Sequence, residues 1–244
     1  MKSKGDDTQN SPMMILQHVP VSVWVLCWMA GIISYFVSIS GGYVPECIPF
    51  IEGCTSISRA GRYGYSYFIF KALMIPAATL IIIYWIMTIS WLKAQGDTSK
   101  SASHLILFLG VTAGLFLILY TCFLGSEGSV YRLMRRFGTT VFFLFSYMGQ
   151  TLLAYRCYKM FGLTQLTGWK LGLCALVTIQ LVTFALVEQL MADSDWIENA
   201  IEWQSASILT FLPVLTWLLW RKSGFRIEVK VSNDSHQTWR RKSR

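Results

Sequence analysis

The side chains best suited to ligand chemistry are three arginines and several acids in segments between apolar blocks. Arg132, Arg135 and Arg136 have i, i+3 and i+4 spacing, so a helix would gather them on one side. Guanidinium groups placed in this way can clamp a phosphate or a carboxylate. Glu198 and Glu202 also have i, i+4 spacing and repel each other unless a cation or proton intervenes. The alternative to a headgroup clamp is loop-to-loop ion pairing with the acids Asp193, Asp195, Glu198 and Glu202, and both interpretations stay open.

Further charges occur beside or inside apolar segments. Glu188 lies within an apolar run, where a carboxylate either faces the interior of a helix bundle or reaches out to the interface. Lys71 can extend its long stem to the headgroups, or it can pair with Glu188 or Glu202. Glu127 follows another apolar block and precedes the arginines. These residues extend the candidate polar cluster.

Metal and cofactor chemistry have little support in the sequence. The histidines His18, His104 and His236 fall on the side opposite to the charged cluster, so we expect no metal site and no cofactor. Phosphate-loop, HExxH and nucleophile-elbow motifs are absent from the sequence, so an enzyme would depend on carboxylates, serines or a cysteine. Cys47 and Cys54 share one segment and would form a disulfide in an oxidising compartment.

The elements that must position these groups are transmembrane helices. Of the 244 residues, 54% are hydrophobic and 14% are charged, and the mean hydropathy is +0.46. The apolar residues form long blocks, which bilayer burial explains better than a soluble core. The net charge of +8 arises mainly beside these blocks and near the C-terminus, so it indicates membrane topology and not nucleic-acid binding.

The sequence predicts an all-α membrane bundle with six transmembrane helices. We expect a leader at 1–18, a six-helix domain at 19–220 and a basic tail at 221–244, with the first block retained and not cleaved as a signal peptide. The predicted spans are Val19–Ile39, Tyr67–Trp91, Leu105–Leu124, Phe137–Tyr155, Leu171–Met191 and Ser205–Trp220.

Basic residues set the predicted orientation, because they are enriched in cytoplasmic segments. Six alternating spans place the basic tail and most other basic residues on one side, so we expect both termini in the cytoplasm. The residues on that side are Lys2, Lys4, Lys93, Lys100, Arg156, Lys159, Lys170 and those from Arg221 onward; Arg59, Arg62, Arg132, Arg135 and Arg136 lie on the other. The tail would attract anionic cytoplasmic lipid by about 1 kcal/mol per nearby charge.

Three short motifs resemble those of one membrane family. Pro45 and Pro49 lead into Ser56 and Ser58 before the second predicted span, Ser126-Glu127 follows the third, and Glu202-Trp203 begins the sixth. In these features the chain resembles the family that joins Frag-type, DRAM-type and Sfk-type proteins. That family includes PGAP-type factors of GPI-anchor lipid remodelling and the CWH-type N-terminal domain. Arg132 occupies the position at which the PGAP-type members carry a histidine.

The resemblance implies a six-helix protein that works on or near lipids in endomembranes such as the Golgi, ER or lysosome, or in the plasma membrane. Our leading hypothesis is a lipid-linked factor in lipid organisation, trafficking including autophagy, or GPI-anchor remodelling, whose polar cluster recognises a headgroup. The alternative is an acyl-transfer or lipid-remodelling enzyme with Glu202 or Glu127 as general base. A channel or transporter is less favoured, because the spans contain few polar residues.

Overall fold

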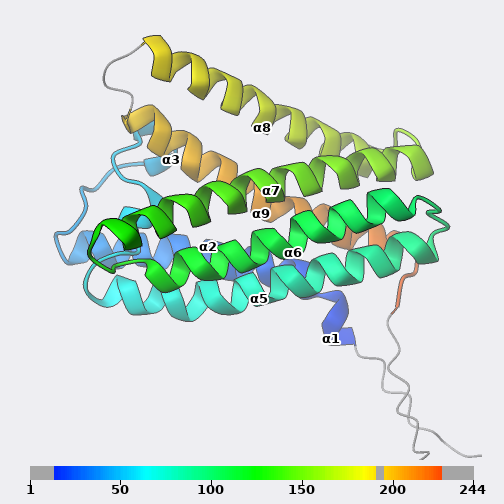
Figure 1. Ribbon diagram of the computed structural model, residues 1–244, viewed down its shortest axis with the longest axis horizontal. Coiled ribbons are helices and arrows are strands. Elements are labelled where there is room, and N and C mark those ends of the chain that lie inside the picture. Colours follow the sequence, from blue (N-terminus) through cyan, green and yellow to red (C-terminus); the bar gives the residue numbers. More distant parts are fainter. Residues whose placement is uncertain (1–13, 191–194, 227–244) are drawn as a thin grey trace, which may run out of the picture.

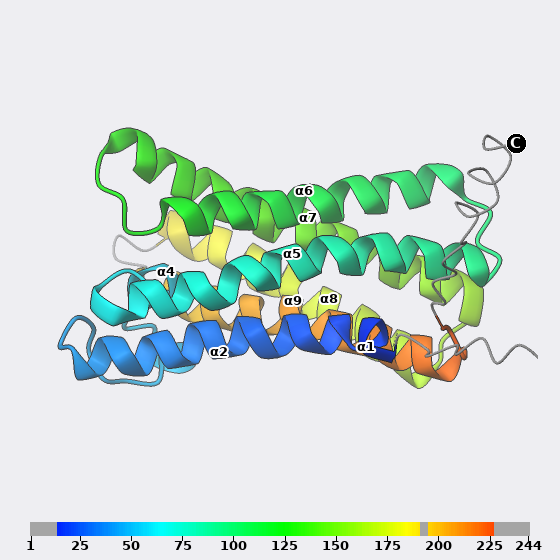
Figure 2. The same cartoon turned by 90° about the horizontal axis from the view of Figure 1, so that it is seen from below.

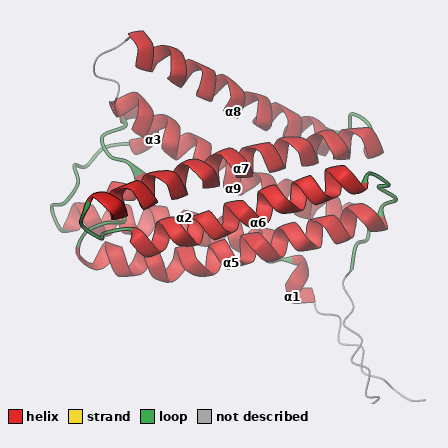
Figure 3. Ribbon diagram, viewed as in Figure 1, coloured by secondary structure: helices red, strands yellow, loops and turns green. Residues whose placement is uncertain are grey.

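The computed structural model describes residues 14–190 and 195–226, and this part of the chain is helical with no strand (Figures 1 and 3). The predicted leader and basic tail lie largely outside the described residues. The helices are α1 (Met14–Gln17), α2 (Val19–Ser40), α3 (Pro49–Glu52), α4 (Ile57–Ala60), α5 (Gly64–Ala94), α6 (Lys100–Phe123), α7 (Ser129–Phe161), α8 (Gln165–Leu190) and α9 (Asp195–Lys222).

The six long helices form an up-and-down bundle. Each packs against the next in the chain, and α9 returns to pack on α2, which closes the ring. Figure 2 shows these helices running side by side, with α1 and the C-terminal end of α9 at the same end of the bundle. We call the opposite end, where α3 and α4 lie, the outer end. Short connections between α5 and α6, α6 and α7, and α7 and α8 favour this antiparallel order.

Five of these helices, α2, α5, α6, α7 and α8, are long and apolar enough to cross a membrane, which indicates an integral membrane protein. The apolar stretch of α9 is shorter, because acidic residues occupy its first turns and Arg221 and Lys222 its last. A sixth span and the cytoplasmic placement of the termini therefore stay predictions. The α5 and α7 helices begin earlier than the predicted spans, at Gly64 and Ser129, so α7 carries its arginines on a helical extension.

Glycines allow the central helices to approach closely. Trp85 of α5 is 1% exposed and lies against Gly110 of α6 and Gly149 of α7. A Cβ atom added at Gly110 would fall 2.1 Å from the Trp85 ring, and one at Gly149 would fall 3.0 Å from it. Small residues are common where membrane helices cross. Lipid tails are as apolar as the side chains, so helices associate through close packing and not through the hydrophobic effect.

A polar network inside the bundle joins four helices. The side chain of Lys170 on α8 is fully buried, although the sequence interpretation placed it in a cytoplasmic loop. Its Nζ donates to Gln150 Oε1 at 3.0 Å, Thr216 Oγ1 at 3.0 Å and the Leu212 carbonyl at 3.2 Å. The Tyr84 hydroxyl completes the network through Thr216 at 2.9 Å and Gln150 at 3.2 Å. All three ammonium donors are used, which offsets part of the cost of burying the charge.

Candidate functional site

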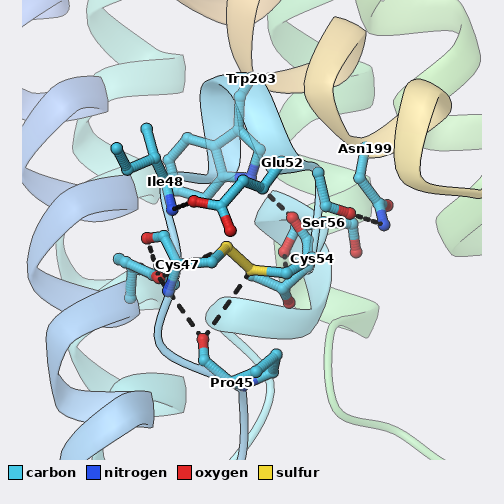
Figure 4. The surroundings of a disulfide bond; sticks show 11 residues. Pro45, Cys47, Ile48, Glu52, Cys54, Ser56, Asn199 and Trp203 are labelled. Atoms are coloured by element: carbon cyan, nitrogen blue, oxygen red, sulfur yellow. Dashed lines mark hydrogen bonds between the residues drawn. A yellow bond between two sulfur atoms is a disulfide. The ribbon is translucent and has the colours of Figure 1, made fainter.

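The segment between α2 and α5 is folded tightly at the outer end. A disulfide joins Cys47 and Cys54, whose Cα atoms are 6.5 Å apart, on either side of α3 (Figure 4). Pro49 occupies the first position of α3, and the Glu52 carboxylate accepts a hydrogen bond from the Ile48 N–H at 2.8 Å. We call residues 43–63 the outer loop. These bonds within the outer loop hold its shape independently of its contacts with α9.

Side chains of α9 hold the outer loop by its backbone. Three loop carbonyl groups each accept a hydrogen bond from an α9 side chain, and two of the donors are labelled in Figure 4. The bonds run from Asn199 to Gly53 at 2.8 Å, from Trp203 to Thr55 at 2.9 Å and from Gln204 to Phe50 at 2.7 Å. Buried carbonyl groups need such partners, so the loop and the first turns of α9 form one unit.

Glu202 connects the loop motif with the α9 motif. Its carboxylate accepts hydrogen bonds from the backbone N–H groups of Ile57 and Ser58, at the beginning of α4. Ser56 caps the same helix, because its Oγ accepts from the Arg59 N–H at 3.2 Å, and it also contacts Ser58 Oγ at 3.1 Å. The two motifs are therefore in direct contact, and Glu202 has a clear positioning role.

A polar cavity of about 740 Å³ lies between this unit and α7. Its volume falls in the usual range for ligand sites. Five arginines and three carboxylates line it, along with hydroxyl groups and Asn199. The charged residues are Arg59, Arg62, Arg132, Arg135, Arg136, Asp195, Glu198 and Glu202. The structure thus brings the three predicted arginines together with Glu198, Glu202, Ser56 and Ser58.

The expected ion pairs between these charges are not formed among the described residues. The salt bridge present there joins Arg156 and Asp97 at the other end of the bundle. Arg135 donates instead to the carbonyl groups of Ser126 and, at 3.4 Å, Phe123. Asp193 lies outside the described residues. The arginines of the cavity are therefore available to an anion.

Several arginines of the cavity lie close enough to act on one another electrostatically. Arg135 experiences the charges of both Arg62 and Arg132. The Nε atom of Arg62 is buried and has no hydrogen-bond partner among the described residues, although its Nη2 reaches Ser58 Oγ at 3.4 Å. Like charges held together in this way favour a bound anion, because its charge relieves their repulsion.

A smaller apolar cavity lies next to the polar one. Tyr120 and Glu202 line both cavities, so the two meet at these residues. The inner cavity has a volume of about 70 Å³, and its walls include Trp28, Leu117 and Phe142. A polar cavity beside an apolar one matches a molecule with a charged head and a hydrocarbon part.

Other members of the predicted cluster lie elsewhere. Glu127 is exposed in the connection between α6 and α7 and does not line the cavity. Lys71 Nζ donates to Tyr67 Oη at 2.6 Å and to the Cys122 carbonyl at 2.9 Å, and no pairing with Glu202 is formed. The Glu188 side chain lies outside the described part of the chain. Lys71 and Glu127 therefore belong to the surroundings of the site.

Sequence reasoning left out cavity residues that come from distant segments. Arg59 and Arg62 were noted only as loop charges, and Tyr120 and Asn199 carried no signal. The proximity of the loop arginines to α7 depends on docking across the bundle. Spacing along one helix cannot reveal it.

The charge of Glu202 should make the affinity of the cavity for an anion depend on pH. Glu202 precedes the apolar stretch 205–220, and its burial, reinforced by the nearby charge of Glu198, raises the pKa of its carboxyl group to about 7. Acidification from pH 8 to pH 6 therefore removes a negative charge from the cavity. We expect phosphatidylglycerol, whose own charge is constant over this range, to bind roughly fivefold more tightly at pH 6.

The matched control for this pH effect is Glu202→Gln, in which the side chain is neutral at both pH values. We expect this variant to bind with equal affinity at pH 6 and pH 8 in titrations of the detergent-purified protein. A pH dependence that persists in the variant would contradict the assignment to Glu202.

Comparisons with known proteins identify no family for this chain. No family model matches the sequence, and neither the curated proteins nor the solved structures give a match.

Proposed function

We propose that the protein is a membrane-embedded lipid-binding factor that recognises an anionic, phosphate-bearing headgroup at the outer end of its helix bundle. The observation that carries this proposal is the group of arginines that line a cavity of about 740 Å³ without forming ion pairs among the described residues. Guanidinium groups bind phosphate oxygens through paired hydrogen bonds. This geometry favours phosphate over a small spherical anion, which cannot accept such a pair.

The adjoining apolar cavity supports a lipid over a soluble anion. It meets the polar chamber at Tyr120 and Glu202, so a headgroup held by the arginines could place hydrocarbon in the inner cavity. The motif resemblance agrees with roles in lipid organisation, trafficking or GPI-anchor remodelling. These roles, and a location in an endomembrane or the plasma membrane, belong to the proposal.

The test removes two arginines that line the cavity and whose side chains form no hydrogen bond or ion pair within the described part of the chain. In Arg132→Gln/Arg136→Gln, we expect the affinity for short-chain phosphatidylglycerol to fall about a hundredfold, near tenfold for each lost charge-assisted contact. The measurement is a titration of detergent-purified full-length protein. Arg135 is kept, because it also bonds to the backbone of the connection before α7.

The matched control removes the same charge from the opposite end. Lys93→Gln/Lys100→Gln should leave the affinity unchanged. Inorganic phosphate serves as a second probe, and a lipid site should bind it far more weakly than phosphatidylglycerol. Wild-type affinity in the arginine variant would refute the headgroup site, whereas equal affinity for phosphate and lipid would show a site for free anions.

A second candidate function is an acyl-transfer or lipid-remodelling enzyme with Glu202 as general base. The observation that favours it is the pKa of about 7 at the junction of the polar and apolar cavities, because a base works best with a pKa near the ambient pH. Labelled phospholipid should then show acyl exchange that disappears in Glu202→Gln. Its bonds to α4 favour the positioning role, so lipid binding stays the leading proposal.

A further inference from the structure

The polar cavity has two walls of opposite charge. Arginines of α7 form one wall, and the outer loop, which is docked on α9, adds Arg59 and Arg62 to the lining. The other wall belongs to the first turns of α9, where Asp195 and Glu198 are exposed to the cavity. Glu202 lies deeper and is already bonded to the backbone of α4.

These walls are held apart although opposite charges attract. The α9 wall is fixed to the outer loop by three hydrogen bonds, and the disulfide fixes the loop itself. On the other wall, Arg135 donates to the carbonyl groups of Phe123, the last residue of α6, and of Ser126 in the connection that follows. No ion pair joins the two walls among the described residues, so a ligand can interact with both.

A ligand with negative charge alone would match only the arginine wall. It would also lie beside two carboxylates, which repel it and receive no hydrogen bond from it. A headgroup that carries a cation next to its phosphate would satisfy both walls. The arginines outnumber the carboxylates by five to three, so a ligand with an overall negative charge fits better than a neutral one.

We infer that the cavity binds a primary ammonium group as well as the phosphate next to it. Its ligands would then be aminophospholipids. This inference rests on the proposed function and specifies its ligand. The phosphate lies against the arginines, and the ammonium lies against Asp195 and Glu198. A primary ammonium donates three hydrogen bonds to carboxylate oxygens, whereas a quaternary ammonium donates none.

The experiment compares headgroups in two pairs, the first matched in net charge and the second differing in whether the ammonium can donate a hydrogen bond. Detergent-purified full-length protein is titrated with lipids of identical short acyl chains. Phosphatidylserine and phosphatidylglycerol share a net charge of about −1, but phosphatidylserine carries an ammonium and a carboxylate that phosphatidylglycerol lacks. Phosphatidylethanolamine and phosphatidylcholine are both zwitterionic but differ in whether the ammonium can donate. We expect the amine-bearing lipid of each pair to bind about tenfold more tightly.

The second arm removes the acidic wall. In Asp195→Asn/Glu198→Gln, both preferences should disappear while the affinity for phosphatidylglycerol is retained or increased, because two repelling charges are gone. The matched control is Glu46→Gln/Glu127→Gln, which removes two outer-end carboxylates that do not line the cavity. The preferences should persist in that control.

The outcomes separate this inference from the function on which it rests. Equal binding of phosphatidylserine and phosphatidylglycerol, with loss of both in Arg132→Gln/Arg136→Gln, would overturn the amine assignment and keep the headgroup site. A preference that survives in Asp195→Asn/Glu198→Gln would also overturn it. Absence of binding by all four lipids would refute the proposed function itself.

Discussion

Replacing Gly110 with alanine is expected to destabilise the protein by about 3 kcal/mol, the upper part of the usual range for overpacking. The added Cβ would fall 2.1–2.4 Å from three atoms of the Trp85 ring. The ring cannot move aside easily, because it is 1% exposed and Gly149 of α7 lies against its other end. The α5 and α6 helices must therefore separate.

Thermal unfolding of the detergent-purified protein measures this effect. A loss of about 3 kcal/mol corresponds to a midpoint lower by roughly 10 °C. The matched control is Gly172→Ala on α8, where an added Cβ meets no atom of the described residues within 4 Å. Alanine is favoured over glycine in a helix by about 1 kcal/mol, so the control should be neutral or more stable. A stable Gly110→Ala variant would contradict the close contact between α5 and α6.

Replacing Gly53 with alanine is expected to abolish headgroup binding while the helix bundle stays folded. Gly53 has a φ of +58°, and its added Cβ would fall 1.7 Å from the carbonyl oxygen of Trp196. The left-handed conformation costs alanine about 1 kcal/mol, and the collision with backbone adds about 2 kcal/mol. The outer loop should therefore leave α9, and the cavity between them should open.

Gly42 provides the matched control within the same connection. It also has a positive φ, +70°, but an added Cβ there meets no atom within 4 Å. Gly42→Ala should therefore cost only the backbone strain and keep the affinity for phosphatidylglycerol, whereas Gly53→Ala should lose it. Retained binding in Gly53→Ala, at an unchanged unfolding midpoint, would show that docking of the loop does not build the site.

These two glycines affect different properties because they lie in different parts of the molecule. Gly110 lies at the centre of the bundle, where helices α5, α6 and α7 share one tryptophan, so its replacement affects stability first. Gly53 lies at the contact of the outer loop with α9 and affects the cavity first. Comparison of the two variants separates loss of folding from loss of the site.

The sequence by itself determined that the chain forms apolar helices and that charges gather between them. The length of each apolar block is a local property of the sequence. A block long enough to cross the hydrocarbon layer predicts a spanning helix, as in α2, α5, α6, α7 and α8. The spacing of Arg132, Arg135 and Arg136 likewise predicted one charged side on α7, and all three line the cavity. Such features depend on residues a few positions apart.

Only the tertiary structure decided which distant groups meet. The outer loop and α9 are about 150 residues apart in sequence, as in the pair Gly53 and Asn199 with a separation of 146. Their docking brings the Glu202 carboxylate to the backbone of α4 and places Arg59 and Arg62 in the cavity lining, whereas Glu127 stays outside it. Burial of Lys170 was decided in the same way, because its acceptors come from α7 and α9. Hydrophobic pattern fixes the helices, whereas contacts between helices depend on packing that no single segment encodes.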